Sequence, residues 1–231
     1  AGTGRQTGQD GDGYAKITPL ALLKDNYLVN ITSNIGTFDK EFSPIVNEYT
    51  LTLDKYDEYF TLDAELSEKD YATVSNLGEY RLDPGETKVI VLTVTAQNGD
   101  TQNYTITARR EVLAEDKHST KLVDLKLNEA KELFDPRFHS LEYEYTTAMS
   151  FGVIEMDISY VKYDELANVV VTTNDPLNKI DGNHISYTKS DQATIYVTVT
   201  LPDEYVDPND PDTHETVYEI TYDKTSATAN S

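Results

Sequence analysis

The chain has 231 residues, of which 41 are acidic and 19 basic, giving a formal net charge of −22. This excess of negative charge excludes a protein that binds the phosphate backbone of nucleic acids, because such binding needs cationic side chains that displace counterions. It also disfavours anionic membrane surfaces, and no apolar run approaches the roughly 20 residues of a membrane-spanning helix. Cysteine is absent, which excludes disulfides, thiol nucleophiles and zinc–thiolate sites. We therefore predict no nucleic-acid partner and no membrane insertion.

The chain begins with a segment that belongs to no predicted core. Residues 1–13 are rich in Gly, Thr, Gln and Asp, a composition typical of a flexible arm. A candidate strand follows, and alternation along a strand places Tyr14, Lys16 and Thr18 on one face and Ala15 and Ile17 on the other. Two interpretations remain open: the segment completes its own module, or it adds as a strand to a neighbouring chain. The residues predicted to form this assembly arm are Tyr14, Ala15, Lys16, Ile17, Thr18 and Leu20.

The rest of the chain repeats itself. The segment Phe38-Asp-Lys-Glu-Phe42 reappears 96 residues later as Phe134-Asp-Pro-Arg-Phe138, and the same offset carries Tyr49 onto Tyr145. It also carries Val29 onto Leu125. A repeat of this length is a whole small domain, since solenoid units have periods of roughly 20–50 residues. The sequence therefore predicts two tandem copies of one module.

Strand patterns dominate both copies. In the first, residues 88–96 alternate, with Ile90, Leu92 and Val94 on one face. Asn98-Gly99 then marks a hairpin turn, because Gly tolerates the positive φ that such turns require. The matching hairpin loop of the second copy is nine residues longer, and its segment 202–212, which contains the addition, is acidic. Insertions of this kind lie on the surface and often carry function.

The pattern resembles the cadherin-like β-sandwich domain, an Ig-like module. The resemblance rests on an alternating first strand, Gly36, the spacing from Phe42 to Tyr49, the Asn98-Gly99 turn and the strand from Tyr104. The second copy has Glu132 in place of the glycine and is a divergent copy. The resemblance implies an all-β fold of two tandem Ig-like sandwiches and supplies no catalytic residue. The expected parts are an N-terminal arm (1–24), a first module (25–113), a linker (114–119), a second module (120–225) and a tail (226–231).

The acidic loop contains the candidate metal ligands. Calcium takes six to eight oxygen ligands, and this loop places several hard oxygens together. The predicted calcium ligands are Asp207, Asn209, Asp210 and Asp212. The alternative is a solvated turn, because Asp, Asn and Pro are also ordinary turn residues. The four histidines are scattered without metal spacing, and no nucleophile elbow or phosphate loop occurs, so we predict no catalytic residue and no enzyme.

Together these features predict a non-enzymatic extracellular structural protein at the cell surface. The leading hypothesis is a subunit of a filament or layer that self-associates through its arm. Two alternatives stay open: adhesin or spacer modules of a larger surface protein, and a carbohydrate-binding accessory module that presents some of the 17 tyrosines to a glycan.

Overall fold

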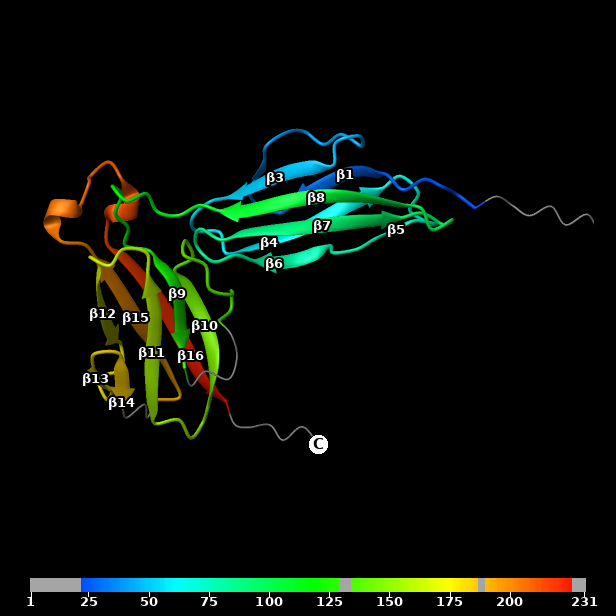
Figure 1. The fold of residues 1–231 in the computed structure, drawn as a ribbon. Coiled ribbons are helices and arrows are strands. Elements are labelled where there is room, and N and C mark those ends of the chain that lie inside the picture. The colour runs from blue at the N-terminus through cyan, green and yellow to red at the C-terminus, as the bar shows by residue number, and fades with distance from the viewer. Residues whose placement is uncertain (1–21, 129–133, 187–189, 226–231) are drawn as a thin grey trace, which may run out of the picture.

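The computed structural model describes residues 22–128, 134–186 and 190–225, which form two β-sandwich modules in tandem (Figure 1). The predicted all-β fold is confirmed. The only helical elements among the described residues are two 3₁₀ turns, η1 (Asp203–Tyr205) and η2 (Pro211–Thr213). No helix of this part of the chain has the length and apolarity to cross a membrane.

The first module packs a three-stranded sheet, ordered β1-β4-β6, against a five-stranded sheet, ordered β2-β3-β8-β7-β5. Within the second sheet β3 runs parallel to β8, and the other pairings are antiparallel. The strands are β1 (Leu28–Ser33), β2 (Thr37–Phe38), β3 (Glu48–Leu53), β4 (Tyr59–Leu66), β5 (Thr73–Val74), β6 (Gly78–Arg81), β7 (Thr87–Thr95) and β8 (Thr101–Arg110).

The second module repeats this plan with two four-stranded sheets, ordered β10-β16-β15-β12 and β13-β14-β11-β9. Here β10 runs parallel to β16, as β3 does to β8. The strands are β9 (Leu122–Leu127), β10 (Glu144–Ser150), β11 (Glu155–Lys162), β12 (Asn168–Thr173), β13 (Lys179–Asp181), β14 (His184–Ser186), β15 (Gln192–Thr200) and β16 (Thr216–Thr225).

Each module has its own hydrophobic core, and the two cores share no residue. The predicted alternation of β7 is confirmed, because Ile90, Leu92 and Val94 are buried whereas Val89 and Val91 face outward. The predicted turn after this strand is also present, with Gly99 at a φ of 91°. Each module is thus a separately packed sandwich, as strands with one apolar face require.

The repeated aromatic residues occupy equivalent environments. The Tyr49 hydroxyl accepts a hydrogen bond from the backbone N–H of Ser43 and donates one to its carbonyl, both at 2.9 Å. In the second module the Tyr145 hydroxyl makes the same pair of contacts with His139, six residues upstream again. Each tyrosine ring also packs on the Phe residues of its own Phe-Asp-x-x-Phe segment. The 96-residue offset therefore holds across this corner.

The first strand departs from that offset. Val29 is 51% exposed, whereas Leu125, its predicted counterpart, is 1% exposed. The structure instead aligns β1 with β9 at an offset of 94. The Asn30 side chain accepts the N–H of Ile31, just as the Asp124 side chain accepts the N–H of Leu125. The register irregularities of the two strands fall at the same offset. A shift of two residues preserves the alternation of a strand, so the sequence pattern alone does not reveal it. The second module thus has two additional residues between its first strand and Phe134.

Candidate functional site at the junction between the modules

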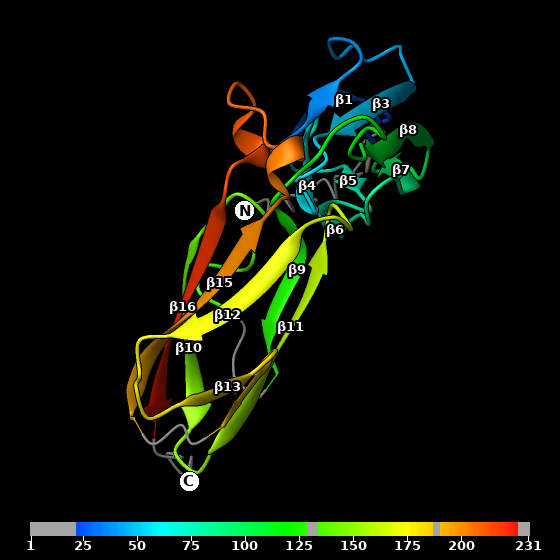
Figure 2. The same cartoon turned by 90° about the vertical axis from the view of Figure 1, so that its left-hand side faces the viewer.

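The acidic insertion lies at the junction between the two modules, where the chain passes from β8 to β9 (Figure 1). Its backbone is fixed to the residues that lead from the linker into β9, since the N–H of Thr120 donates to the carbonyl of Asp212 at 2.8 Å. Figures 1 and 2 show that the long axes of the two modules are not collinear, so the molecule is bent here. The contacts at this bend decide how one module is held against the other.

Tyr56 of the first module reaches into the insertion. Its hydroxyl donates to the Asp212 carboxylate at 2.8 Å and lies 2.9 Å from the Ser119 hydroxyl. The Lys55 ammonium lies 3.6 Å from the same carboxylate and 4.4 Å from the centre of the Tyr56 ring. Burial raises the pKa of the Tyr56 phenol, so it stays a neutral donor at physiological pH. One buried hydroxyl thereby ties the first module to both the linker and the insertion.

Arg110, the last residue of β8, forms the second part of the junction and is almost completely buried. Its guanidinium donates to the carbonyls of Lys55 at 3.0 Å and Leu82 at 2.8 Å, and also to the hydroxyl of Tyr163. Tyr163 belongs to the second module, and its own hydroxyl donates to the Lys55 carbonyl at 2.6 Å. The Tyr163 and Tyr56 rings meet edge to face with their centres 5.0 Å apart. We call Tyr56, Arg110, Ser119, Tyr163 and Asp212 the junction clasp.

More exposed contacts extend this interface along β4 and β6. The Arg137 guanidinium lies 3.0 Å from the Glu79 carboxylate and above the Tyr59 ring, with 4.3 Å to its centre. The His139 imidazole lies 3.3 Å from the Asp57 carboxylate. Exposed ion pairs contribute at most about 1 kcal/mol each, so these contacts orient the modules more than they hold them. The clasp contributes more to the stabilisation because Tyr56, Arg110 and Ser119 are buried and their polar groups are hydrogen-bonded.

The four predicted calcium ligands lie in this loop, and the carboxylates of its three aspartates each accept a hydrogen bond from the protein. Asp207 accepts the backbone N–H of Asn209 at 2.9 Å, and Asp210 accepts that of Asp212 at 3.1 Å. Asp212 itself belongs to the clasp. Within the described residues, no group of three or more His, Cys, Asp or Glu side chains is placed to hold a metal ion. The predicted turn chemistry is therefore visible in this loop, and calcium binding stays a prediction.

A thermal-shift measurement tests that prediction. If native Asp207, Asn209, Asp210 and Asp212 ligate calcium, millimolar calcium raises the melting temperature, because the ion then binds only the folded state. Asp207→Ala, which leaves the clasp carboxylate of Asp212 untouched, removes the rise. An unchanged melting temperature across the calcium titration contradicts the site. Magnesium at the same concentration controls for ionic strength.

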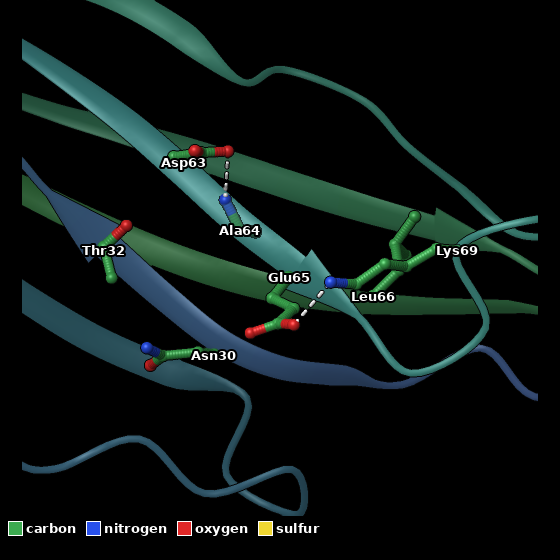
Figure 3. A pocket seen from close by; sticks show the side chains of 7 residues that line it. All are labelled: Asn30, Thr32, Asp63, Ala64, Glu65, Leu66 and Lys69. Atoms are coloured by element: carbon green, nitrogen blue, oxygen red, sulfur yellow. Dashed lines mark hydrogen bonds and ion pairs between the residues drawn. The ribbon is translucent and has the colours of Figure 1, made fainter.

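A shallow hollow lies on the outer face of β1 and β4 in the first module (Figure 3). The charged groups that line it are already paired, because Lys69 forms an ion pair with Glu65 at 2.6 Å and Asp63 accepts the N–H of Ala64 at 2.8 Å. It offers no convergent set of polar groups for a substrate. The lining residues are Asn30, Thr32, Asp63, Ala64, Glu65, Leu66 and Lys69.

The predicted assembly arm, from Tyr14 to Leu20, lies outside the described residues, but its point of attachment does not. The N–H of Leu23 donates to the Gln97 side chain at 3.0 Å, and the carbonyl of Leu23 accepts the N–H of Asn98 at 3.1 Å. Both partners belong to the β7–β8 hairpin, one full length of β8 away from the clasp. The arm therefore joins the body at the end remote from the second module.

Sequence reasoning missed the clasp residues other than Asp212. They lie far apart in the chain, and Tyr56, Tyr163 and Arg110 look ordinary one at a time. One signal was available: Tyr56 and Tyr163 have no tyrosine at the corresponding position of the other copy, which has Gly152 and Ser67 there. A residue that differs between the two copies of a repeat can have a role in one copy only. The two copies contribute different surfaces to their junction, so such residues are expected there.

No family model matches this chain, and no curated protein matches it. Among solved structures, an extracellular four-domain fragment of protocadherin gamma B7 matches with a TM-score of 0.24 and 14% identity, covering 83% of this chain and 51% of that one. The EC1-2 fragment of human mucin-like protocadherin matches with a TM-score of 0.25 and 5% identity over 85% and 98% of the two chains. Murine CEACAM1b matches with a TM-score of 0.21 and 12% identity over 90% and 88%.

These are distant matches to cadherin and Ig-like domains. The class of the protein rests on its own strand pairings: it is a tandem β-sandwich protein whose two modules are joined by a largely buried polar clasp.

Proposed function

We propose that this chain is a non-enzymatic extracellular structural subunit that assembles into a surface filament or layer, using its N-terminal arm as a strand added to a neighbouring chain. The observation that carries the proposal is the attachment of Leu23 to the β7–β8 hairpin. The arm leaves one end of the molecule while the second module occupies the other, so each chain has a donor end and a separate body. A contact between such unlike surfaces is head-to-tail, and it generates a filament when it does not close.

The charge distribution supports the same proposal. Residues 1–21 contain two basic residues, Arg5 and Lys16, and two acidic residues, Asp10 and Asp12, so they are neutral. The whole net charge of −22 therefore falls on residues 22–231. Bodies of like charge repel one another and stay apart at low ionic strength. A neutral arm is the part of the chain that approaches a neighbour at the lowest electrostatic cost.

Deletion of residues 1–21 is expected to abolish association while leaving both sandwiches folded, because the two cores that the described residues form begin only at Leu28. Sedimentation velocity at high concentration and negative-stain imaging provide the measurement, with calorimetry as the check of folding. The control replaces residues 1–13 alone with an unrelated Gly/Ser segment, which retains Tyr14–Leu20 and should still assemble. A full-length chain that is strictly monomeric, or a truncated chain that still associates, contradicts the proposal.

The clasp favours one alternative, a spacer within a larger surface protein. Buried hydrogen bonds at the junction hold two modules in one orientation, which suits a spacer as well as a subunit. A spacer and a subunit differ in the association experiment, since an isolated spacer stays monomeric and its arm deletion changes nothing.

A further inference from the structure

The edges of the four sheets are not equally protected. An unpaired strand edge presents free N–H and C=O groups, and proteins usually block it with bulges, charges, short strands or a covering segment. In the first module β2 and β5 are two residues long, and β6 carries Glu79 and Arg81. β1 has a register irregularity, and the Asn30 side chain occupies the N–H of Ile31.

The second module blocks three of its four edges in the same ways. β9 has a bulge and the side-chain cap from Asp124, and β13 has three residues of which two are charged. β10 is covered by a bridge between Asp135 and Thr146. The fourth edge, β12, carries none of these devices among the described residues. Its six residues, Asn-Val-Val-Val-Thr-Thr, contain no charge, proline or glycine, and they pair with β15 in an unbroken register.

The side chains of β12 divide cleanly between its two faces. Val171 is buried and Val169 packs against the core, whereas Val170 on the outer face is 48% exposed. Figure 2 shows β12, in yellow, at the side of its sheet with β15 as its neighbour. Leu166 and Leu177, which flank the strand, are also exposed apolar residues. The strand that corresponds to it in the first module, β5, has two residues and offers no comparable edge.

We propose that the free edge of β12 is the acceptor on which the Tyr14–Thr18 segment of a neighbouring chain adds as a further strand. This inference rests on the proposed function and names the surface that receives the arm. The segment has five residues and β12 has six, so the donor strand can pair along almost all of this edge. Pro19 ends the donor strand because proline lacks the N–H that a ladder needs. With Ala15 and Ile17 facing inward, they extend the core beside Val169 and Val171.

The reach of the arm makes this contact intermolecular. Thr18 precedes Leu22 by four residues, which span at most about 14 Å when fully extended. β8 alone separates the hairpin that holds Leu23 from the junction, and ten strand residues span about 31 Å at roughly 3.4 Å per step. β12 lies beyond that junction in the second module (Figure 1). A chain therefore cannot place Thr18 on its own β12, and the donor comes from another copy.

A charge placed on this edge is expected to prevent the addition. Val170→Lys in the full-length chain should weaken association at least about tenfold in sedimentation experiments, a change of 1.4 kcal/mol. The matched control is Val161→Lys, on the opposite sheet of the same module, where the valine is 51% exposed. That variant should associate like the unmodified chain. Both substitutions replace exposed side chains, so both variants should remain folded. Their melting temperatures check this.

The absence of cysteine allows a direct test of proximity that does not depend on Val170→Lys folding. Lys16→Cys and Val170→Cys chains, carrying different tags, are mixed under mild oxidation. A heterodimeric disulfide is expected, because both residues are central in their strands and lie on the outer face, and bridging needs Cα atoms within about 7 Å. Lys16→Cys mixed with Val161→Cys should give no heterodimer.

The outcomes separate the two proposals. If deletion of residues 1–21 abolishes association but Val170→Lys does not, and no cross-link forms, then the arm acts on another surface and the assignment of β12 is wrong. If the deletion leaves association unchanged, the proposed function itself fails, and with it the donor. A cross-link together with loss of association in both variants supports both.

Discussion

Arg110→Ala is expected to destabilise the protein by about 2–4 kcal/mol, because the substitution removes hydrogen bonds to two carbonyls at the junction and leaves one of them, buried, without a donor. The Leu82 carbonyl loses the Arg110 contact, and the Lys55 carbonyl keeps only its bond from Tyr163. For a domain of about 100 residues, each kcal/mol lowers the melting temperature by roughly 4–8 °C. The same change removes the bond between Arg110 and Tyr163, so the two modules should also lose their fixed orientation.

Calorimetry and small-angle scattering measure these two effects separately. Calorimetry is fitted with two transitions, because the modules have separate cores and need not unfold together. Scattering reports the distribution of module orientations. The control is Arg109→Ala, one residue earlier on the exposed face of β8, where the side chain bonds to the Thr52 hydroxyl and to no other group of the described residues. If both arginine variants behave alike, the clasp does not hold the junction as described.

The second large effect is expected from Tyr218→Phe, which removes one buried oxygen. The Tyr218 hydroxyl accepts the N–H of Leu122 at 3.0 Å and donates to the carbonyl of Ser140 at 2.9 Å. Both backbone groups are buried and lose their partner, at about 1–3 kcal/mol each. Tyr104→Phe should have a similar effect in the first module, where the hydroxyl bridges Leu28 and Pro44 in the same way.

Chemical denaturation provides the measurement for both variants. Tyr80→Phe is the control, because its hydroxyl bonds a single, solvent-exposed carbonyl, that of Asn76, and its loss should cost under about 1.5 kcal/mol. A Tyr218→Phe variant as stable as the Tyr80→Phe variant would show that the two hydrogen bonds of the Tyr218 hydroxyl add nothing to the free energy of unfolding beyond those of an exposed hydroxyl.

Alkaline pH offers an independent readout of the same residue. Burial raises the pKa of Tyr218 well above its ordinary value, so the folded chain keeps a phenol proton that the unfolded chain releases near pH 10. The unfolded state then binds fewer protons than the folded state. The associated stability is therefore complete below pH 10 and falls as the pH rises above it. The Tyr218→Phe variant should show a smaller loss of stability above pH 10 than the unmodified chain.

A structural feature of this protein was predictable from the sequence when the residues that form it lie close together in the chain. The corner built from Phe42 and Tyr49 was predictable, because its residues lie within a short segment that recurs intact at Phe138 and Tyr145. The alternation of β7 was predictable for the same reason. The alignment of Val29 with Leu125 was wrong because two additional residues before Phe134 leave the strand period unchanged.

The junction could not be predicted from residue patterns. Tyr56 and Asp212 are 156 residues apart, and their contact depends on how two complete modules meet. Neither residue belongs to a sequence motif from which its contact with the other could be predicted. The acidic insertion was recognised as a surface loop, and its composition left a calcium site and a solvated turn open. It gave no sign that the Asp212 carboxylate would contact a phenol and a lysine of the other module.

The bend between the modules has a consequence for the shape of any polymer. When a fixed bend recurs once per subunit, successive chains rotate by the same amount, and the product is a coil with a defined pitch. A straight rod requires that the rotations cancel. In the proposed filament, loosening the clasp would replace that regular pitch with flexible joints inside each subunit. The persistence length of such a filament would then depend on the hydrogen bonds around Arg110 and Tyr56.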